Sequence, residues 1–305
     1  MLKHYRLIQA LFFLVALLDA AVLPADDFTV ETAQAAAAKG DARAQFYLSR
    51  RYAHGEGVPQ DYSRAVEYLR QAAAQGYARA ENNLGAFYAQ GLGLPQSDTE
   101  AFNWFRQAAE QGDPLAEFSL GHAYQNGRGV TADPLAAVKW YQQAAAQNQT
   151  NAIEALADLH LGGRSVPADL PNSVHWFEKA AAQGSLNALN SLGYIYESGG
   201  VGVPKNPAQA AGYYRQAAER GFPKGQFNLA RSYLYGIGLD ADPVEACKWY
   251  YIASRHGDGT ARRYLEELEG QIQYGDLPVK PLTSEQINEA VRRATEFETA
   301  RSKSP

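Results

Sequence analysis

A repeat of 36 residues constrains this chain more than any other sequence feature. Its units end in the glycines Gly40, Gly76, Gly112, Gly184, Gly221 and Gly257, with Asn148 in the one remaining slot and a single spacing of 37 residues. Each unit holds a leucine at one place, in the order Leu48, Leu84, Leu120, Leu156, Leu192 and Leu229. Repetition at a fixed period of this length indicates stacked units, each of which contacts its neighbours, and not one central core.

Small and aromatic residues recur at further fixed places. The residue after each leucine is Ser49, Gly85, Gly121, Ala157, Gly193 or Ala230, and three residues later come Tyr52, Tyr88, Tyr124, His160, Tyr196 and Tyr233. A second aromatic series, Tyr68, Trp104, Trp140, Trp176, Tyr213 and Trp249, contains all four tryptophans. Spacings of three and four residues put such side chains on one helical face. We therefore expect two antiparallel helices per unit, which approach closely at the small residues and pack the aromatic series between them.

These residues resemble the Sel1-like repeat, a relative of the tetratricopeptide repeat. The residues that match its pattern in the second unit are Ala80, Leu84, Gly85, Tyr88, Gly91, Gly93, Ala101, Trp104, Ala108, Ala109 and Gly112. The resemblance covers residues 40–257 and implies an all-α fold, an α/α superhelical solenoid of about six helix-turn-helix repeats. It also implies that proteins or peptides bind on the concave face, which the first helix of each pair lines.

The two ends of the chain depart from the repeat. Residues 1–25 combine a basic start with an apolar run over 7–18, which is typical of a cleaved secretory signal peptide; cleavage after Ala20 and an uncleaved anchor are the alternatives. We expect a capping helix in residues 26–39, capping helices in 258–300 and a disordered tail in 301–305. Thr283 and Gln286 form a capping-box pair ahead of the last helix. A partner-binding tail helix is the alternative for that segment.

Composition and motifs narrow the function. With 28 Lys and Arg against 33 Asp and Glu, the chain lacks the basic excess of a nucleic-acid binder. Its single cysteine, Cys247, excludes an intrachain disulfide framework and a Cys-based zinc site. The histidines lack helical ligand spacing, and the Gly-x-Gly turns recur with the period, so we expect neither a metal, nor a cofactor, nor a nucleotide loop. No Gly-x-Ser-x-Gly elbow, Walker loop or His-Glu-x-x-His motif is present, and we expect no enzyme activity.

The partner-binding groove is expected at the positions of each first helix that do not repeat. In chain order they are Arg43, Phe46, Arg50, Arg79, Asn82, Phe118, His122, Asn151, Glu154, Asp158, Asn187, Asn190, Tyr194, Glu197, Lys224, Phe227, Arg231 and Tyr235. Their charge changes sign along the array, and three phenylalanines would supply exposed apolar anchors. The alternative for those phenylalanines is that they turn inward and pack between repeats.

The fourth unit departs most from the pattern. His160 replaces the tyrosine, and Ser173 replaces an alanine. One explanation is simple degeneracy of the repeat, with His160 as a hydrogen-bonded core residue. The other is a specialised pocket near His160 and Asp158.

Three functions remain open for a protein of this kind. The first is a non-enzymatic scaffold of the bacterial periplasm or exterior that binds a protein or peptide. The second is an accessory protein that binds a cell-wall glycan or an exopolysaccharide. The third is a β-lactamase-like hydrolase, because cysteine-rich relatives are reported to have that activity. The single cysteine of this chain weakens the third.

Overall fold

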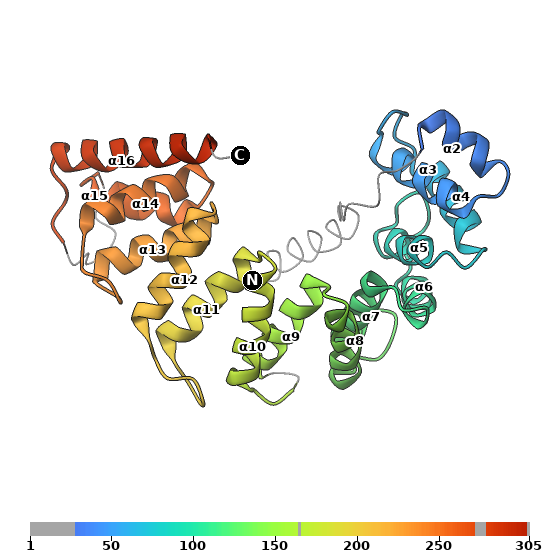
Figure 1. The fold of residues 1–305 in the computed structure, drawn as a ribbon, viewed down its shortest axis with the longest axis horizontal. Helices are drawn as coiled ribbons and strands as arrows, with labels where there is room; N and C mark the ends of the chain where they lie inside the picture. The colour runs from blue at the N-terminus through green and yellow to red at the C-terminus, as the bar shows by residue number, and fades with distance from the viewer. Residues whose placement is uncertain (1–27, 164–165, 272–278, 304–305) are drawn as a thin grey trace. The chain divides into compact units, whose positions relative to one another are not determined.

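The computed structural model of this chain is all-α (Figure 1). It describes residues 28–163, 166–271 and 279–303; over these ranges there is no strand, and an isolated bridge joins Gly200 to Val203. The chain divides into two units, Met1–Leu156 (unit 1) and Ala157–Pro305 (unit 2). The expected signal peptide, residues 1–25, lies outside the described residues.

The helices alternate regularly along both units. Unit 1 holds α2 (Val30–Ala37), α3 (Ala42–His54), α4 (Tyr62–Ala73), α5 (Ala78–Gln90), α6 (Asp98–Glu110), α7 (Pro114–Asn126) and α8 (Pro134–Ala146). The helix α9 (Thr150–Gly162) spans the boundary between the units. Unit 2 holds α10 (Leu170–Ala182), α11 (Leu186–Ser198), α12 (Pro207–Glu219), α13 (Pro223–Tyr235), α14 (Pro243–Arg255), α15 (Gly259–Leu268) and α16 (Ser284–Ser302).

Each repeat is a pair of helices, and in four repeats the first helix ends in the same way. The first helices α3, α5, α7 and α13 end at a glycine in the left-handed conformation, where a side chain would be strained. The residue that caps the second helix then donates its backbone N–H to the carbonyl of the recurring Tyr or His, as Asp133 does to Tyr124 at 2.9 Å. Asn148 takes the glycine slot with φ of 62°, a conformation that Asn tolerates better than most residues.

The core of a repeat is the contact between a small residue on the first helix and a ring on the second. A Cβ atom added to Gly121 would stand 2.7 Å from ring carbons of Tyr141, and one added to Gly85 would stand 2.7 Å from the ring of Phe105. The buried rings are Phe105, Tyr141, Phe177, Tyr214 and Tyr250, which replace Leu69 of the first repeat. The expected close approach at the small residues is therefore present.

The expectation that the tryptophan series fills the core is wrong for most of its members. Trp104, Trp140 and Trp176 are half-buried, and Trp249 is the one tryptophan that is buried. The buried ring belongs to the next residue in the sequence, such as Tyr141 after Trp140. Successive residues of a helix point about 100° apart, so only one of the two can face the first helix.

Replacing Tyr141 by alanine should cost more stability than replacing Trp140. Tyr141 is fully buried and its hydroxyl donates to Gln125 at 2.7 Å, so Tyr141→Ala should lower the free energy of unfolding by about 3–5 kcal/mol. Trp140→Ala should cost roughly half as much, because part of its ring already contacts solvent. Urea denaturation followed by circular dichroism measures both values. An equal or larger loss for Trp140→Ala would contradict this packing.

Hydrogen bonds to buried amide and carboxylate side chains join the two helices of single repeats in unit 1. The glutamine that follows each second helix donates to the repeat's own first helix: Gln75 to Gln45 at 2.8 Å, Gln111 to Glu81 at 2.6 Å and Gln147 to Glu117 at 3.0 Å. Burial raises the pKa of the Glu81 and Glu117 carboxyls, with a smaller contribution from nearby Asp113. These bonds satisfy polar groups that would otherwise be costly to bury.

The helices α2 and α16 lie at the two ends of the described chain. Thr29 and Thr32 form a capping box at the start of α2, and Thr283 and Gln286 form one at the start of α16. The helix α16 packs on α14, where the rings of Trp249 and Phe297 lie 5.0 Å apart. The expected disordered tail, 301–305, overlaps α16, which continues to Ser302. Residues 304–305 lie outside the described part of the chain.

Candidate functional site

The candidate site consists of the surfaces that first helices present in each unit. We call the exposed and half-buried side chains of α3, α5 and α7 the first-helix face of unit 1, and those of α11, α13 and α15 the first-helix face of unit 2. Seven of the predicted groove residues are exposed, namely Arg43, Arg79, Asp158, Asn187, Tyr194, Lys224 and Tyr235. Eight are half-buried, namely Arg50, His122, Asn151, Glu154, Asn190, Glu197, Phe227 and Arg231. Phe46, Asn82 and Phe118 are buried.

The expectation that three phenylalanines project as apolar anchors is wrong. Phe46 is 6% exposed and packs 5.3 Å from the ring of Tyr77, at the start of the next first helix. Phe118 is 9% exposed and packs against Tyr141. Phe227 is half-buried between Tyr250 and Tyr264. Their position lies two residues before the repeating leucine, so these rings reach neighbouring helices and are covered there.

Tyrosines are the exposed aromatic side chains on the first-helix face of unit 2. Tyr194 on α11 is 59% exposed and Tyr235 on α13 is 41% exposed. Exposed tyrosine is common in protein interfaces, because it combines a large apolar ring with a hydrogen-bonding hydroxyl. The apolar anchors that the sequence assigned to phenylalanine are thus offered by tyrosine in this unit.

A hydrogen-bonded network holds this face together between α11 and α13. Arg231 forms an ion pair with Glu197, which also accepts a hydrogen bond from the Tyr214 hydroxyl at 2.8 Å. Burial and the negative charge of Glu197 raise the pKa of the Tyr214 hydroxyl. One turn earlier, Asn228 donates to Asn190 at 2.7 Å. These bonds fix the surroundings of Tyr194 and leave its ring free to contact a partner.

Sequence reasoning missed Tyr214 and Asn228, because it considered only first-helix positions outside the repeating series. A signal for Tyr214 exists in the sequence. Its counterpart Tyr141 donates to Gln125, and Gln125 occupies the same place after the leucine as Glu197. A polar residue five places after the leucine therefore accompanies a tyrosine in the second helix of both repeats.

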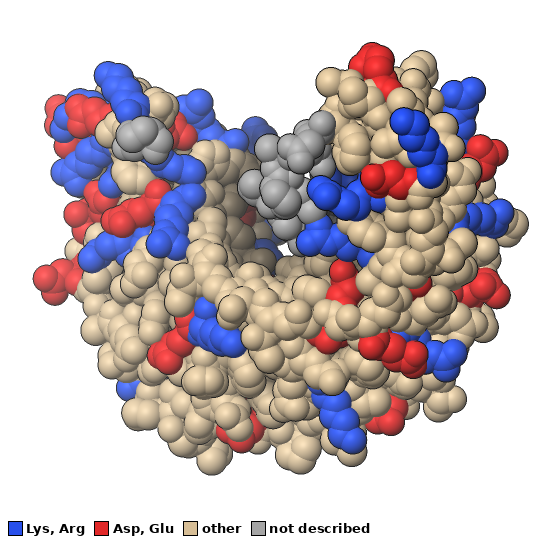
Figure 2. Space-filling model, turned by 45° about the vertical axis from the view of Figure 1, so that its right-hand side comes forward, with Lys and Arg blue, Asp and Glu red and all other residues tan. Residues whose placement is uncertain are grey.

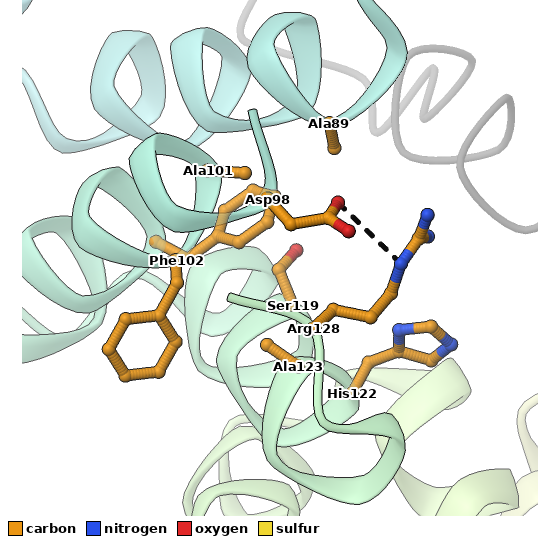
Figure 3. A pocket seen from close by; sticks show the side chains of 9 residues that line it. Ala89, Asp98, Ala101, Phe102, Ser119, His122, Ala123 and Arg128 are labelled. Carbon is orange, nitrogen blue, oxygen red and sulfur yellow. Dashed lines mark ion pairs between the residues drawn. The ribbon is translucent and has the colours of Figure 1, made fainter. Parts of the chain in front are cut away.

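A small pocket opens between α6 and α7 in unit 1 (Figure 3). Its apolar walls include Ala89, Ala101, Phe102, Phe105 and Ala123. His122, Ser119 and an ion pair between Asp98 and Arg128 at 3.7 Å form its polar side. The enclosed space holds little more than one water-sized sphere, far less than the volume of about 300–1,000 Å³ that is usual for small-molecule sites.

The polar groups of this pocket are engaged in ways that do not favour hydrolysis. The Ser119 hydroxyl donates to the Leu115 carbonyl at 2.9 Å, and Asp98 pairs with Arg128. Burial, with a smaller contribution from the Arg128 charge, lowers the pKa of His122 to about 4. A serine nucleophile needs a base within hydrogen-bond reach and a third group that orients the base. Here Ser119 and Asp98 are both bound to other partners.

Acid should destabilise the fold through His122. The pKa of an unfolded histidine is near 6.5, so as pH falls from about 6.5 to 4 the unfolded chain takes up the proton first. We expect His122 to reduce the free energy of unfolding by about 2–3 kcal/mol between pH 7 and 4.5. Urea denaturation of the protein and of His122→Gln at both pH values measures this, and the variant should lose correspondingly less. An identical pH dependence in both proteins would contradict the burial of His122.

The thiol of Cys247 and the potential metal ligands of the described residues do not form a reactive site. Burial raises the pKa of the Cys247 thiol to about 12, so it stays protonated and unreactive at neutral pH. Over the described ranges, no group of three or more His, Cys, Asp or Glu side chains is placed to hold a metal ion. None of the helices described combines the length and the apolar character that crossing a membrane requires.

The fourth repeat differs from the others at Ser173 and His160. The Ser173 hydroxyl donates to the Ala157 carbonyl at 2.9 Å, which explains a polar residue at a buried place. His160 is half-buried, and its Nδ1 atom is buried with no hydrogen-bond partner in the described part of the chain. The expected hydrogen bond is thus missing at Nδ1. Asp158 is exposed.

Comparison with known families identifies the repeat directly. The family model of the Sel1 repeat matches six consecutive segments, at residues 42–77, 78–113, 114–149, 150–185, 186–222 and 223–258. Over 74 residues, 24% of this chain, the sequence is 36% identical to chitin synthase regulatory factor 3 of Schizosaccharomyces pombe. That match covers 8% of the yeast protein.

Two crystal structures of bacterial proteins are similar over most of the chain. The protein c5321, a protective antigen present in uropathogenic Escherichia coli strains, matches 88% of this chain with 33% identity and a TM-score of 0.75. A Sel1 repeat protein from Oxalobacter formigenes matches 77% with 33% identity and a TM-score of 0.68. This chain spans 56% of the first protein and 68% of the second.

Proposed function

The chain belongs to the Sel1 repeat family, whose solenoids are generally non-catalytic scaffolds for protein interaction, and we propose that this member binds a protein partner through its first-helix faces in the bacterial periplasm or outside the cell. The observation that carries the proposal is the pair of exposed tyrosines, Tyr194 and Tyr235, on first helices of unit 2. Both rings remain exposed on their helices, although the Tyr235 hydroxyl lies close to Tyr264 on α15. An interface needs such side chains, because its binding energy concentrates in a few aromatic and arginine residues.

The polar surroundings of these tyrosines support the same use. Glu197 and Arg231 neutralise each other, and Asn190 bonds to Asn228, so these side chains need little rearrangement when a partner covers them. A surface that is already ordered loses less side-chain entropy on binding than a mobile one. The face is therefore suited to a partner that covers tyrosine rings and bonds to polar groups at the rim.

The location outside the cytoplasm is supported by the sequence of the first residues. Lys3 and Arg6 precede an apolar run over residues 7–18, the order found in secretory signal peptides. We propose that this segment directs export and is then removed. Fractionation of the native bacterium tests it: the mature protein should leave the cells with the periplasmic contents or appear in the medium, and its retention with the cytoplasm would contradict export.

Site-specific photo-crosslinking tests the proposed binding face. Benzoylphenylalanine placed at Tyr194 or Tyr235 in the native bacterium should give a protease-sensitive adduct, because these first-helix positions contact the partner. The matched controls are Ala208 and Gln216, which are exposed on the second helix α12. They should give no adduct. Adducts from the α12 positions alone would contradict the proposal, and adducts that carry carbohydrate and resist protease would favour a glycan ligand.

A further inference from the structure

The first-helix face of unit 1 carries one sign of charge. The helices α3, α5 and α7 contain two carboxylates, Glu81 and Glu117, and both are buried. Each accepts hydrogen bonds from glutamine, and burial raises the pKa of each. The helices themselves therefore present no exposed carboxylate on this face.

Three arginines of α3 and α5 form no ion pair in the described part of the chain, whereas Arg51 on α3 pairs with Glu56 at 2.5 Å. Arg43 and Arg79 are exposed and Arg50 is half-buried, and over the described ranges none of the three forms an ion pair. The nearby Asp41 carboxylate caps α3 by accepting the Ala44 N–H at 2.9 Å. Arg79 lies close enough to the buried Asp113 to favour its charged form. We call Arg43, Arg50 and Arg79 the basic face.

These arginines are arranged as a patch. Arg43 and Arg79 occupy the same place in successive repeats, and Arg50 follows Arg43 by seven residues, two turns along one side of α3. Two turns of α3 span about 10 Å. The Phe46 ring on α3 lies 5.3 Å from the ring of Tyr77, two residues before Arg79. The space-filling view shows several Lys and Arg side chains, with Asp and Glu side chains between them, on the part of the chain drawn at the right (Figure 2). The face is thus basic although the whole chain carries a formal charge of −5.

We propose that the basic face receives an acidic, extended segment of the protein partner. Carboxylates three residues apart in an extended chain are separated by about 10 Å, which matches the spacing of the arginines. Arginine pairs with a carboxylate through two parallel hydrogen bonds, and the surrounding charge speeds the encounter. The half-buried Tyr77 ring, packed on Phe46, offers an apolar contact beside the patch.

A short acidic segment fits better than a long polyanion. The patch has three positive charges, whereas the chain as a whole is acidic, so a polymer that extends beyond the patch would meet repulsion. The inference rests on the proposed scaffold function and adds the chemistry of the partner.

Fluorescence anisotropy of labelled octaglutamate with the full-length protein tests this inference. At 0.15 M NaCl the combined change Arg43→Glu, Arg50→Glu and Arg79→Glu should weaken binding at least tenfold, and the corresponding changes to Gln should weaken it by a smaller factor. The matched control is Lys39→Glu, Arg106→Glu and Lys139→Glu, which alters three exposed bases of unit 1 outside the first helices by the same charge. The control should change binding less than threefold, and higher salt should weaken binding to the unaltered protein. Circular dichroism should be the same for all variants.

Three results would overturn the proposal. They are an equal loss in the control, no binding of octaglutamate by the unaltered protein, and competition by octameric polyphosphate as strong as that by the peptide. The crosslinks at Tyr194 and Tyr235 distinguish failure of the acidic-segment proposal from failure of the scaffold proposal. If they persist while octaglutamate does not bind, the acidic-segment proposal fails and the scaffold remains; if both are absent, the scaffold proposal fails too.

Discussion

The contact between a small residue on the first helix and a ring on the second is the interaction on which the rest of this structure depends. Gly193 faces Tyr214, Gly121 faces Tyr141 and Gly85 faces Phe105 so closely that an added Cβ atom would meet the ring. Because the helices approach at this point, the recurring leucine and alanines of both helices become fully buried. One such pair is too small to bury both of its sides, so it is stable only within a stack.

The same constraint decides which residues are available for a partner. Side chains that face the ring or the next repeat are fixed by packing, and this group includes Phe46 and Phe118 as well as the repeating series. The first-helix positions that remain differ between the two units. Unit 1 presents arginines without exposed carboxylates on its first helices, whereas unit 2 presents tyrosines in a network that is neutral at the Glu197–Arg231 pair. The two units therefore offer different chemistry on equivalent helices.

The sequence predicted the features that recur, but it did not predict which side chains of a helix face its neighbours. The period, the helix pairs and the capping box at Thr283 follow from spacing and from local backbone chemistry. Periodicity could not decide whether Trp140 or Tyr141 faces the first helix, because both recur with the same period. The sequence placed Phe46 in the groove because its position does not repeat, and a position that varies in sequence can still be buried. Contacts such as Gln111 to Glu81 join residues 30 apart and leave no local signal.

Two glycines of one repeat test the central contact most directly. Gly193 on α11 faces the Tyr214 ring, whereas an added Cβ atom at Gly212 on α12 would meet nothing within 4 Å. Replacing either by alanine gains about 0.5–1 kcal/mol of helix propensity, so urea denaturation should show Gly212→Ala stabilised by about that amount. Gly193→Ala should be destabilised by about 1–3 kcal/mol, because the added methyl overpacks the core. Equal stabilisation by both changes would contradict the account.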